Sequence, residues 1–569
     1  MIRTLARASF RAPLVRQRAL SSLNLSATCS KEELSSKTAI IDDSDQIQLS
    51  YRALNEISAV LAAQLVGYAN GGGPGGTVAA FNKSSTGFVV SMLAAWKLGK
   101  VFVPLCIDHS ESELSYVLKD SNVSVVCCSS TSGVNEAFLN KCPVPIMETE
   151  RLIKSHALLA AGKNGIVLGE GSKSYLSDPA VGAGGEDGAI CIYTSGTTGR
   201  PKGVLHTHSS LLHMTKALVQ AWQYSERDKI LHFLPLYHVH GLVNKLLCVL
   251  SVGGTVDFLP SASAPALWSR LAEEERLYQL AQATAGQQLD PLTLFMAVPT
   301  VYARLLEHAK MVRAPEEREA LTAAVAALSR MRLMACGSAA LPDSVLSSWE
   351  ELTGYRLLER YGMTEMGMAL SNPYEGHRKQ GSVGQPLPNV TCRLVDDNGQ
   401  EVGEGPGELR VKGPNMFREY LNRADATAES FDEQGWFKTG DIAQLEDGYY
   451  KILGRNSTDI IKSAGYKLSA LEIERELLSH PQILEAAVIG LPDDTLGEKV
   501  VAVIALRAGA EGETSLLCEH TAREALTKYL QDKLARYKQP RDYFVVEAIP
   551  RNHMGKVNKK SLPQLLGIS

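Results

Sequence analysis

The sequence lacks long hydrophobic runs and an excess of positive charge. A membrane-spanning helix needs roughly 18 consecutive apolar residues, and the longest candidate, residues 89–96, is followed at once by Lys97. The formal net charge of −4 offers a polyanion no overall electrostatic attraction. We therefore expect no integral membrane segment and no nucleic-acid partner.

Cysteine is too sparse and too scattered to build a metal cluster. The chain has 10 cysteines among 569 residues, without the paired spacing of a metal site; Cys127 and Cys128 are merely adjacent. We interpret them as reduced thiols. A chain of this length exceeds one ordinary hydrophobic core, so at least two domains are expected.

Acidic residues are missing from the start of the chain. Arginines recur from Arg3 to Arg18, whereas the first acid is Glu32. This composition is typical of an organellar presequence, which we assign to residues 1–25. The density of basic residues favours the mitochondrial matrix, with a plastid as the alternative; a disordered basic tail is the other interpretation.

From about residue 38 the chain alternates between strand and helix patterns. Such alternation predicts an α/β fold with largely parallel sheets. The polar segment 273–290 has helix-forming residues, and we expect it to form a surface excursion, a segment that protrudes from the fold. After Gly454 a smaller α+β unit begins, with helices at 470–478 and 519–534 and strands at 486–490, 500–506 and 543–546.

The segment Tyr193-Thr-Ser-Gly-Thr-Thr-Gly-Arg-Pro-Lys-Gly203 has the chemistry of a phosphate-binding loop. It follows the apolar strand 189–192, and its glycines let backbone amides approach an anion closely. Hydroxyl groups and Lys202 add further donors and a positive charge. The Gly-Lys-[Ser/Thr] ending of a Walker motif is missing. The loop therefore predicts that the chain binds a polyphosphate through a motif other than a Walker motif.

Four further motifs follow in order along the chain. They are Leu234-Pro-Leu-Tyr-His-Val-His-Gly-Leu242, Tyr361-Gly-Met-Thr-Glu365, Trp436-Phe-Lys-Thr-Gly-Asp441 with Gly454-Arg455, and Pro550-Arg-Asn-His-Met-Gly-Lys556. With the phosphate loop, they make the chain resemble the adenylate-forming superfamily of acyl-CoA synthetases, luciferases and peptide-synthetase adenylation domains. The resemblance covers nearly the whole chain after the presequence. It implies an AMP-forming acid–thiol ligase that works through an acyl-adenylate.

The resemblance also implies binding sites for ATP, Mg²⁺ and the co-substrate CoA. Lys556 would meet the α-phosphate and the reacting carboxylate, Thr364 would hydrogen-bond that phosphate, and Glu365 would hold Mg²⁺ together with Thr198. Tyr361 would stack on adenine. The residues expected to bind nucleotide or CoA are Thr194, Ser195, Gly196, Thr197, Thr198, Gly199, Lys202, Tyr361, Asp441, Arg455 and Gly465.

The implied domain organisation has two parts. Residues 26–454 would form a large N-terminal adenylation domain of layered α/β sheets with a β-subdomain, and residues 460–569 a small mobile α+β lid. The lid would turn on residues 455–459, presenting Lys556 for adenylation and the loop near Gly465 for thioester formation. One extra residue after Arg455, relative to the commoner pattern, makes Ser457 or Thr458 the expected hinge residue.

Within the superfamily, the chain looks most like malonyl-CoA synthetases. This closer resemblance lies in residues 234–242, 298–304, 337–341 and 358–365. It implies an acyl pocket built from His238, Arg304, Gly337, Ser338 and Met363.

Arg304 and Ser338 would bind the distal carboxylate of the acid. A guanidinium pairs with a carboxylate in a fork, and a monoacid would leave that buried charge unpaired. Arg270 and Arg332 are rival anchors, and Arg304 could instead pair with Glu307.

The sequence thus predicts a malonyl-CoA synthetase that also accepts methylmalonate, because one methyl group is weak grounds for rejection. Alternatives are a CoA ligase for an aryl, medium-chain or branched acid, a stand-alone adenylation enzyme that loads a carrier protein, and a non-catalytic nucleotide-binding relative. The last would have lost Lys556 or Glu365, and both are present. A monomer or weak oligomer is expected.

Overall fold

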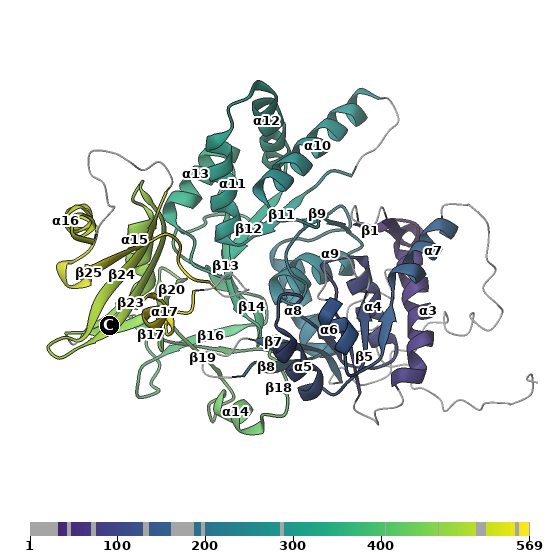
Figure 1. Cartoon of the computed structure of the whole chain (residues 1–569), viewed down its shortest axis with the longest axis horizontal. Helices are drawn as coiled ribbons and strands as arrows, with labels where there is room; N and C mark the ends of the chain where they lie inside the picture. The colour runs from purple at the N-terminus through teal and green to yellow at the C-terminus, as the bar shows by residue number, and fades with distance from the viewer. Residues whose placement is uncertain are drawn as a thin grey trace, which may run out of the picture.

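The structure is a computed structural model that describes residues 32–42, 47–69, 76–128, 136–160, 187–194, 200–284, 290–403, 405–464, 466–507, 519–551 and 557–567. Within these ranges the strands form four sheets (Figure 1). The predicted presequence 1–25 lies outside them.

Two large, mainly parallel sheets make up the greater part of the molecule. The first has the order β15 (Gln385–Pro386), β14 (Gly367–Ser371), β13 (Leu358–Met363), β12 (Leu333–Gly337), β11 (Leu294–Ala297), β9 (Lys229–His232), β10 (Thr255–Phe258), β1 (Thr38–Asp42), β2 (Ile47–Ser50). The second has the order β18 (Glu419–Tyr420), β8 (Lys202–Thr207), β7 (Gly188–Thr194), β4 (Phe102–Pro104), β3 (Thr77–Ala80), β5 (Val123–Cys128), β6 (Ile146–Glu148). This architecture confirms the predicted α/β class.

Helices cover both faces of these sheets because each apolar sheet face must be buried. The main hydrophobic core lies between the two sheets and includes side chains of α3 (Tyr51–Ala69), α4 (Thr86–Lys97), α8 (His208–Ala221), the π-helix η3 (His240–Leu247) and α9 (Cys248–Ser251). A second core packs α10 (Ala264–Ala283), α11 (Pro299–Met311), α12 (Pro315–Ser329) and α13 (Asp343–Thr353) against the outer face of the first sheet. The outer face of the second sheet is covered by α5 (Glu111–Asp120) and α6 (Glu136–Lys141).

A small antiparallel sheet follows, of β16 (Thr391–Val395), β17 (Pro406–Lys412), β19 (Phe437–Glu446) and β20 (Tyr449–Arg455). The last part of the chain then forms a separate α+β unit with its own cores. Its sheet contains β22 (Tyr466–Ser469), β21 (Ile460–Ser463), β24 (Gly497–Leu506), β23 (Ile483–Asp493) and β25 (Asp542–Val546). Its helices are α15 (Ala470–Leu478), α16 (Glu519–Leu530), α17 (Leu562–Leu566) and the short 3₁₀ turn η4 (Arg536–Lys538). We call this unit the lid; it forms the green-to-yellow end of the molecule in Figure 1.

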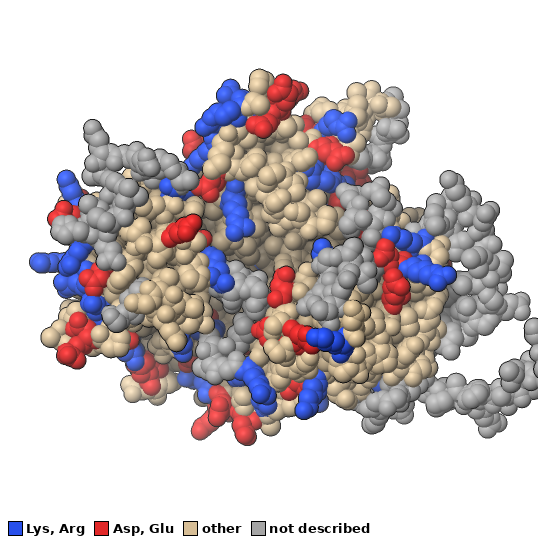
Figure 2. Space-filling view, viewed as in Figure 1, with Lys and Arg blue, Asp and Glu red and all other residues tan. Residues whose placement is uncertain are grey.

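Three short helices lie outside these groups: α2 (Glu32–Ser35), α7 (Glu150–Ala160) and α14 (Ala424–Glu429). Among the described helices, none is both long and apolar enough to cross a bilayer. The face seen in Figure 2 carries basic and acidic side chains in mixture and without a single-sign patch.

The segment 273–290 is helical up to Ala283 and mostly exposed at residues 279–284, as predicted, but its start departs from a surface excursion. Its first part continues α10, and Glu274 is only 1% exposed. Glu274 accepts hydrogen bonds from Arg270 at 3.0 Å and from the backbone N–H of Leu292 at 2.8 Å. The acid is buried because it is paired, which composition alone does not reveal.

Candidate active site

A cavity of about 420 Å³ lies where the carboxyl ends of β12 and β13 meet the small antiparallel sheet and lid helix α15. We call it the central cavity. Its volume falls in the range of small-molecule sites. Predicted site residues from widely separated segments line it: Thr194, Lys202, Gly337, Ser338, Tyr361, Met363, Thr364, Glu365, Asp441 and Arg455.

One end of the cavity carries the residues predicted to hold the ribose. β19 and β20 pair antiparallel with Asp441 opposite Arg455, and Arg455 Nε donates to Asp441 Oδ1 at 3.0 Å. Tyr361 donates its hydroxyl to the other oxygen, Asp441 Oδ2, at 2.5 Å. The carboxylate is thereby fixed from two sides, and each oxygen keeps a lone pair for a further donor.

The two residues that flank the predicted phosphate-binding loop, Thr194 and Lys202, lie at this cavity. Thr194 and Lys202 are paired across β7 and β8 and line the cavity. The loop residues Ser195, Gly196, Thr197, Thr198 and Gly199 lie outside the described residues. His206 Nε2 lies 2.7 Å from the carbonyl oxygen of Thr364, and its pKa is lowered to about 4 by burial. A neutral His206 therefore donates to that carbonyl and fixes Thr364 next to the loop.

Glu365 presents a carboxylate suited to a hard divalent cation. Its side chain is buried, lines the cavity, and accepts one hydrogen bond, from the hydroxyl of Tyr420 to Oε1 at 2.8 Å. Lys202 Nζ lies 4.8 Å from the centre of the same tyrosine ring. One carboxylate with spare lone pairs, beside a phosphate-binding loop, matches the way proteins hold Mg²⁺. Thr198, the other expected ligand, is not among the described residues.

Two residues expected to act during the reaction also fall outside the described ranges, Gly465 and Lys556. Their flanking segments are described. Arg551 and Val557, which precede and follow the segment that contains Lys556, form an isolated antiparallel bridge. Ala464, next to Gly465, has φ +50°.

His238 and Arg304 are not among the cavity-lining residues. His238 lies half-buried just before η3, in ring contact with Tyr237. Arg304 lies on α11 with an exposed side chain. Glu307, the alternative ion-pair partner expected for Arg304, instead accepts a hydrogen bond from Arg507 of the lid at 3.2 Å.

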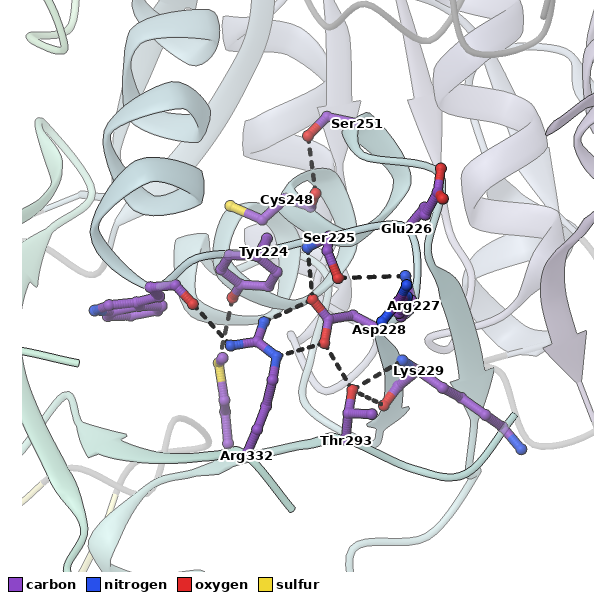
Figure 3. A network of polar contacts seen from close by, with 12 residues as sticks. Tyr224, Ser225, Glu226, Arg227, Asp228, Lys229, Cys248, Ser251, Thr293 and Arg332 are labelled. Carbon is purple, nitrogen blue, oxygen red and sulfur yellow. Dashed lines mark hydrogen bonds and ion pairs between the residues drawn. The ribbon is translucent and has the colours of Figure 1, made fainter. Parts of the chain in front are cut away.

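The two rival arginines are already saturated by carboxylates. Arg332 forms a bidentate ion pair with Asp228, with Nε and Nη2 at 2.7 and 2.6 Å from the two carboxylate oxygens (Figure 3). Arg270 donates to Asp257 at 2.6 Å and to Glu274 at 3.0 Å. Neither guanidinium is free for a substrate.

Arg360 is the arginine that sequence reasoning missed. It is 3% exposed and lines the cavity, and both Nη1 and Nη2 lie 3.4 Å from Ser338 Oγ. Within the described part of the chain, no carboxylate lies at ion-pair distance and its Nε has no hydrogen-bond partner. Burial lowers its pKa to about 10, so it stays cationic at neutral pH. The sequence feature that could have identified Arg360 is its position directly before Tyr361, in a strand that carries one of the motifs.

The backbone around Arg360 is shaped to fit its side chain. β12 and β13 pair in parallel with Gly337 beside Arg360. A Cβ at position 337 would lie 2.6 Å from the Arg360 carbonyl oxygen and 2.9 Å from its Cζ, so only glycine fits. Ser338 adopts φ +75°, a left-handed conformation that non-glycine residues rarely hold outside functional sites.

His240 adds a second unpaired polar group to this region. It is 5% exposed on η3, and among the described residues neither ring nitrogen has a hydrogen-bond partner. Burial, reinforced by the charge of Arg360, holds its pKa well below the usual value. A neutral imidazole near a cationic guanidinium can donate a hydrogen bond to an anion. π-Helices often mark functional sites.

Comparisons with known proteins identify the family of the chain. Residues 28–421 match the AMP-binding enzyme family and residues 472–556 match the AMP-binding enzyme C-terminal domain. A mitochondrial malonate–CoA ligase of Xenopus laevis is 42% identical over 84% of this chain and 81% of its own length. ATP-bound MatB from Rhodopseudomonas palustris superposes with a TM-score of 0.77 at 30% identity, covering 96% of this chain and 99% of that one. A malonyl-CoA ligase in complex with methylmalonyl-CoA and AMP superposes with a TM-score of 0.61 at 34% identity, covering 93% and 100%.

Proposed function

Because the chain belongs to the AMP-binding enzyme family, we propose that it is a malonyl-CoA synthetase that joins malonate to CoA at the expense of ATP. The predicted resemblance is confirmed, and the chain is an ATP-dependent, AMP-forming CoA ligase. Methylmalonate differs from malonate by one methyl group, so we expect it to be accepted too.

The buried guanidinium of Arg360 is the observation that carries the choice of a dicarboxylic acid. Arg360 and Ser338 line the central cavity side by side, and the buried His240 is close enough to feel the charge of Arg360. An unpaired buried charge costs several kcal/mol, and a carboxylate that accepts from Arg360, Ser338 and His240 removes this cost. A monoacid would leave it in place. Arg304 stays the alternative anchor, on the exposed side of α11.

The first step joins the acid to the nucleotide. A malonate carboxylate oxygen attacks the α-phosphorus of ATP, a P–O bond forms, and pyrophosphate leaves. Thr364 and Lys202 lie in the cavity wall as donors to the phosphates, and Asp441 with Arg455 would orient the ribose. Lys556 would bring a positive charge to the reacting oxygens. These groups act by positioning and by electrostatic stabilisation.

Magnesium would be held by the carboxylate of Glu365 and by the phosphates, with Thr198 as a further ligand. When bound, it neutralises charge on the phosphates as pyrophosphate departs. Two hydrogen bonds keep Glu365 in place: the hydroxyl of Tyr420 donates to its carboxylate, and the N–H of Phe417 donates to its main-chain carbonyl oxygen at 2.7 Å.

The second step forms the thioester. The thiol sulfur of CoA attacks the carbonyl carbon of malonyl-AMP and loses its proton to solvent. The C–S bond forms, the bond from that carbon to the phosphate oxygen breaks, and AMP leaves with this oxygen. We place residues 26–454 in the adenylation domain and residues 460–569 in the lid, with 455–459 as the hinge. Gly465 would then face the pantetheine arm after the lid has turned.

The experiment is CoA-dependent AMP release by the protein lacking residues 1–25, with malonate, methylmalonate, succinate, acetate and octanoate as acids. We expect malonate to dominate. Arg360→Met, which keeps the volume and removes the charge, should lose malonate selectively, by about 100-fold in kcat/KM.

Arg304→Ala in the same assay decides between the two anchors. If only Arg304→Ala loses activity with malonate, the distal carboxylate binds to Arg304 on α11. Preference of the wild type for acetate or octanoate, with both variants unaffected, overturns the dicarboxylate proposal and leaves a CoA ligase for another acid.

We further propose that the protein works in the mitochondrial matrix. The support is the arginine-rich, acid-free start of the chain and the similarity to a ligase named as mitochondrial. A fluorescent fusion of residues 1–40 should enter mitochondria, and replacement of its arginines by glutamine should abolish import. Delivery to a plastid would overturn the assignment.

A further inference from the structure

Lys559 is a buried cation held between two carboxylates at the base of the lid. Its Nζ lies 2.6 Å from Asp459 Oδ1 and 2.6 Å from Glu474 Oε1. Its side chain is only 10% exposed, which is unusual for lysine and requires this double pairing. Lys559 lies three positions after Lys556 in the chain.

Asp459 connects Lys559 to the nucleotide end of the central cavity. Its Oδ2 accepts from the backbone N–H of Arg455 at 3.0 Å, and Asp459 itself lines the cavity. The guanidinium of Arg455 in turn pairs with Asp441. Gly454 adopts φ +130°, and a Cβ there would lie 2.4 Å from the Cβ of Asp459, so this turn is built around the Asp459 side chain.

Glu474 connects Lys559 to the interior of the lid. It lies on α15, and its Oε1 also accepts from the backbone N–H of Val488 on β23 at 2.7 Å. The main-chain oxygen of Asp459 accepts from the N–H of Ala470, the first residue of α15, at 2.7 Å. Asp459, the last residue of the predicted hinge segment 455–459, is thus bound to the lid through its backbone and through Lys559.

A continuous series of contacts therefore runs from Asp441 through Arg455, Asp459 and Lys559 to Glu474 on α15. We propose that Lys559 is a positioning residue that ties the hinge to the lid in the adenylation orientation, so that the ribose-binding pair and the lid are held in register. The inference rests on the two-step reaction proposed above. The chain superposes better on ATP-bound MatB, with a TM-score of 0.77, than on the malonyl-CoA ligase complex with methylmalonyl-CoA and AMP, with a TM-score of 0.61. This difference supports the assignment of the present lid orientation to adenylation.

The charge of Lys559 is what makes this arrangement possible. Without it, Asp459 and Glu474 would be two buried carboxylates facing each other, and like charges repel strongly at low dielectric. The hinge would then separate from α15. Loss of the tether should slow the step that uses this orientation more than the step that follows rotation.

The test compares Lys559→Met and Lys559→Arg with Lys560→Met, which alters the exposed neighbouring lysine. Adenylation is measured as malonate-dependent ATP–pyrophosphate exchange without CoA. Thioester formation is measured as a single turnover of preformed malonyl adenylate with CoA. We expect Lys559→Met to slow adenylation about tenfold more than thioester formation, within the range usual for coupling between sites. Lys559→Arg should recover part of the loss, and Lys560→Met should match the wild type.

A readout independent of activity is trypsin cleavage after Arg455 or Lys462, followed by mass spectrometry with and without AMP. In Lys559→Met, cleavage should accelerate and AMP should protect less. Equal slowing of both steps, or unchanged cleavage and rates, overturns the proposal. A wild type that shows no malonate-dependent exchange refutes the proposed function instead, and the cleavage assay still tests the tether.

Discussion

Tyr361 and Asp441 are joined by a 2.5 Å hydrogen bond between the phenol and Asp441 Oδ2. The two residues lie 80 positions apart in the sequence, on β13 and β19. The contact fixes the carboxylate proposed for the ribose before any nucleotide binds.

Tyr361→Phe keeps the ring and removes this hydrogen bond. Because Asp441 would lose one of its two side-chain donors, we expect the KM for ATP to rise about three- to tenfold with little change in kcat. Steady-state kinetics with ATP as the varied substrate checks this. Asp441→Asn also weakens the Arg455 contact and should raise the KM for ATP further. An effect of Tyr361→Phe on kcat alone would contradict the assignment of Asp441 to the ribose.

Gly337→Ala tests the fit of Arg360. The added methyl would collide with the Arg360 carbonyl and guanidinium, so the guanidinium must move away from Ser338. We expect the KM for malonate to rise about tenfold or more, with ATP binding unchanged. Gly67→Ala is the matched control, because a Cβ at Gly67 meets nothing within 4 Å. Equal behaviour of both variants would contradict the pocket assignment.

Glu365→Gln should lower the adenylation rate by about 100-fold or more, because the neutral amide holds a divalent cation poorly. ATP–pyrophosphate exchange at increasing MgCl₂ measures the effect. Tyr420→Phe should raise the Mg²⁺ concentration for half-maximal rate without abolishing exchange. A Glu365→Gln enzyme with the wild-type magnesium dependence would rule out Glu365 as a ligand.

Glu359 predicts a pH dependence of stability. Burial raises its pKa to about 8, partly offset by Arg475, with Asp343 acting in the same direction as burial. The folded protein thus keeps this proton where the unfolded chain has lost it. The stabilising contribution is complete below the ordinary pKa of glutamate and is lost as pH rises towards 8, at no more than about 1.4 kcal/mol per pH unit.

Thermal unfolding between pH 5 and 9 should therefore show a decline that Glu359→Gln flattens. The glutamine keeps the shape and cannot ionise. An unchanged slope in the variant would show that other groups set the pH dependence.

Much of the secondary structure of the lid could be predicted from local patterns, although its strands β21 and β22 were not. Helix 470–478 is confirmed to the residue, the strand expected at 486–490 is the centre of β23, and the strand expected at 500–506 covers β24 except for its first three residues. The predicted helix from residue 519 ends at Leu530 and not at 534. Periodicity within one element decides these features, because each buries one face against its own small core.

The acid end of the site could not be read in the same way. Arg304 and Arg360 both lie in motif segments, and only the packing of β13 between β12 and β14 shows that Arg360 is the buried one. Likewise, Arg332 looks available in the sequence, whereas its partner Asp228 lies 104 positions away. Arg270 has a local partner that spacing does reveal, Glu274 four positions along α10, but its second partner Asp257 comes from strand β10. Charge pairing between elements is a property of tertiary contacts, so composition and spacing do not specify it.

The unpaired charge of Arg360 also links substrate to folding. A protein that buries a cation without a counter-ion is less stable empty than filled, and an anion that completes the pair stabilises the folded state by mass action. Malonate alone, without ATP or CoA, should then raise the melting temperature, and acetate should raise it less. The acid would act as a folding aid, so a chain weakened by a mutation far from the site should regain stability in cells rich in its own substrate.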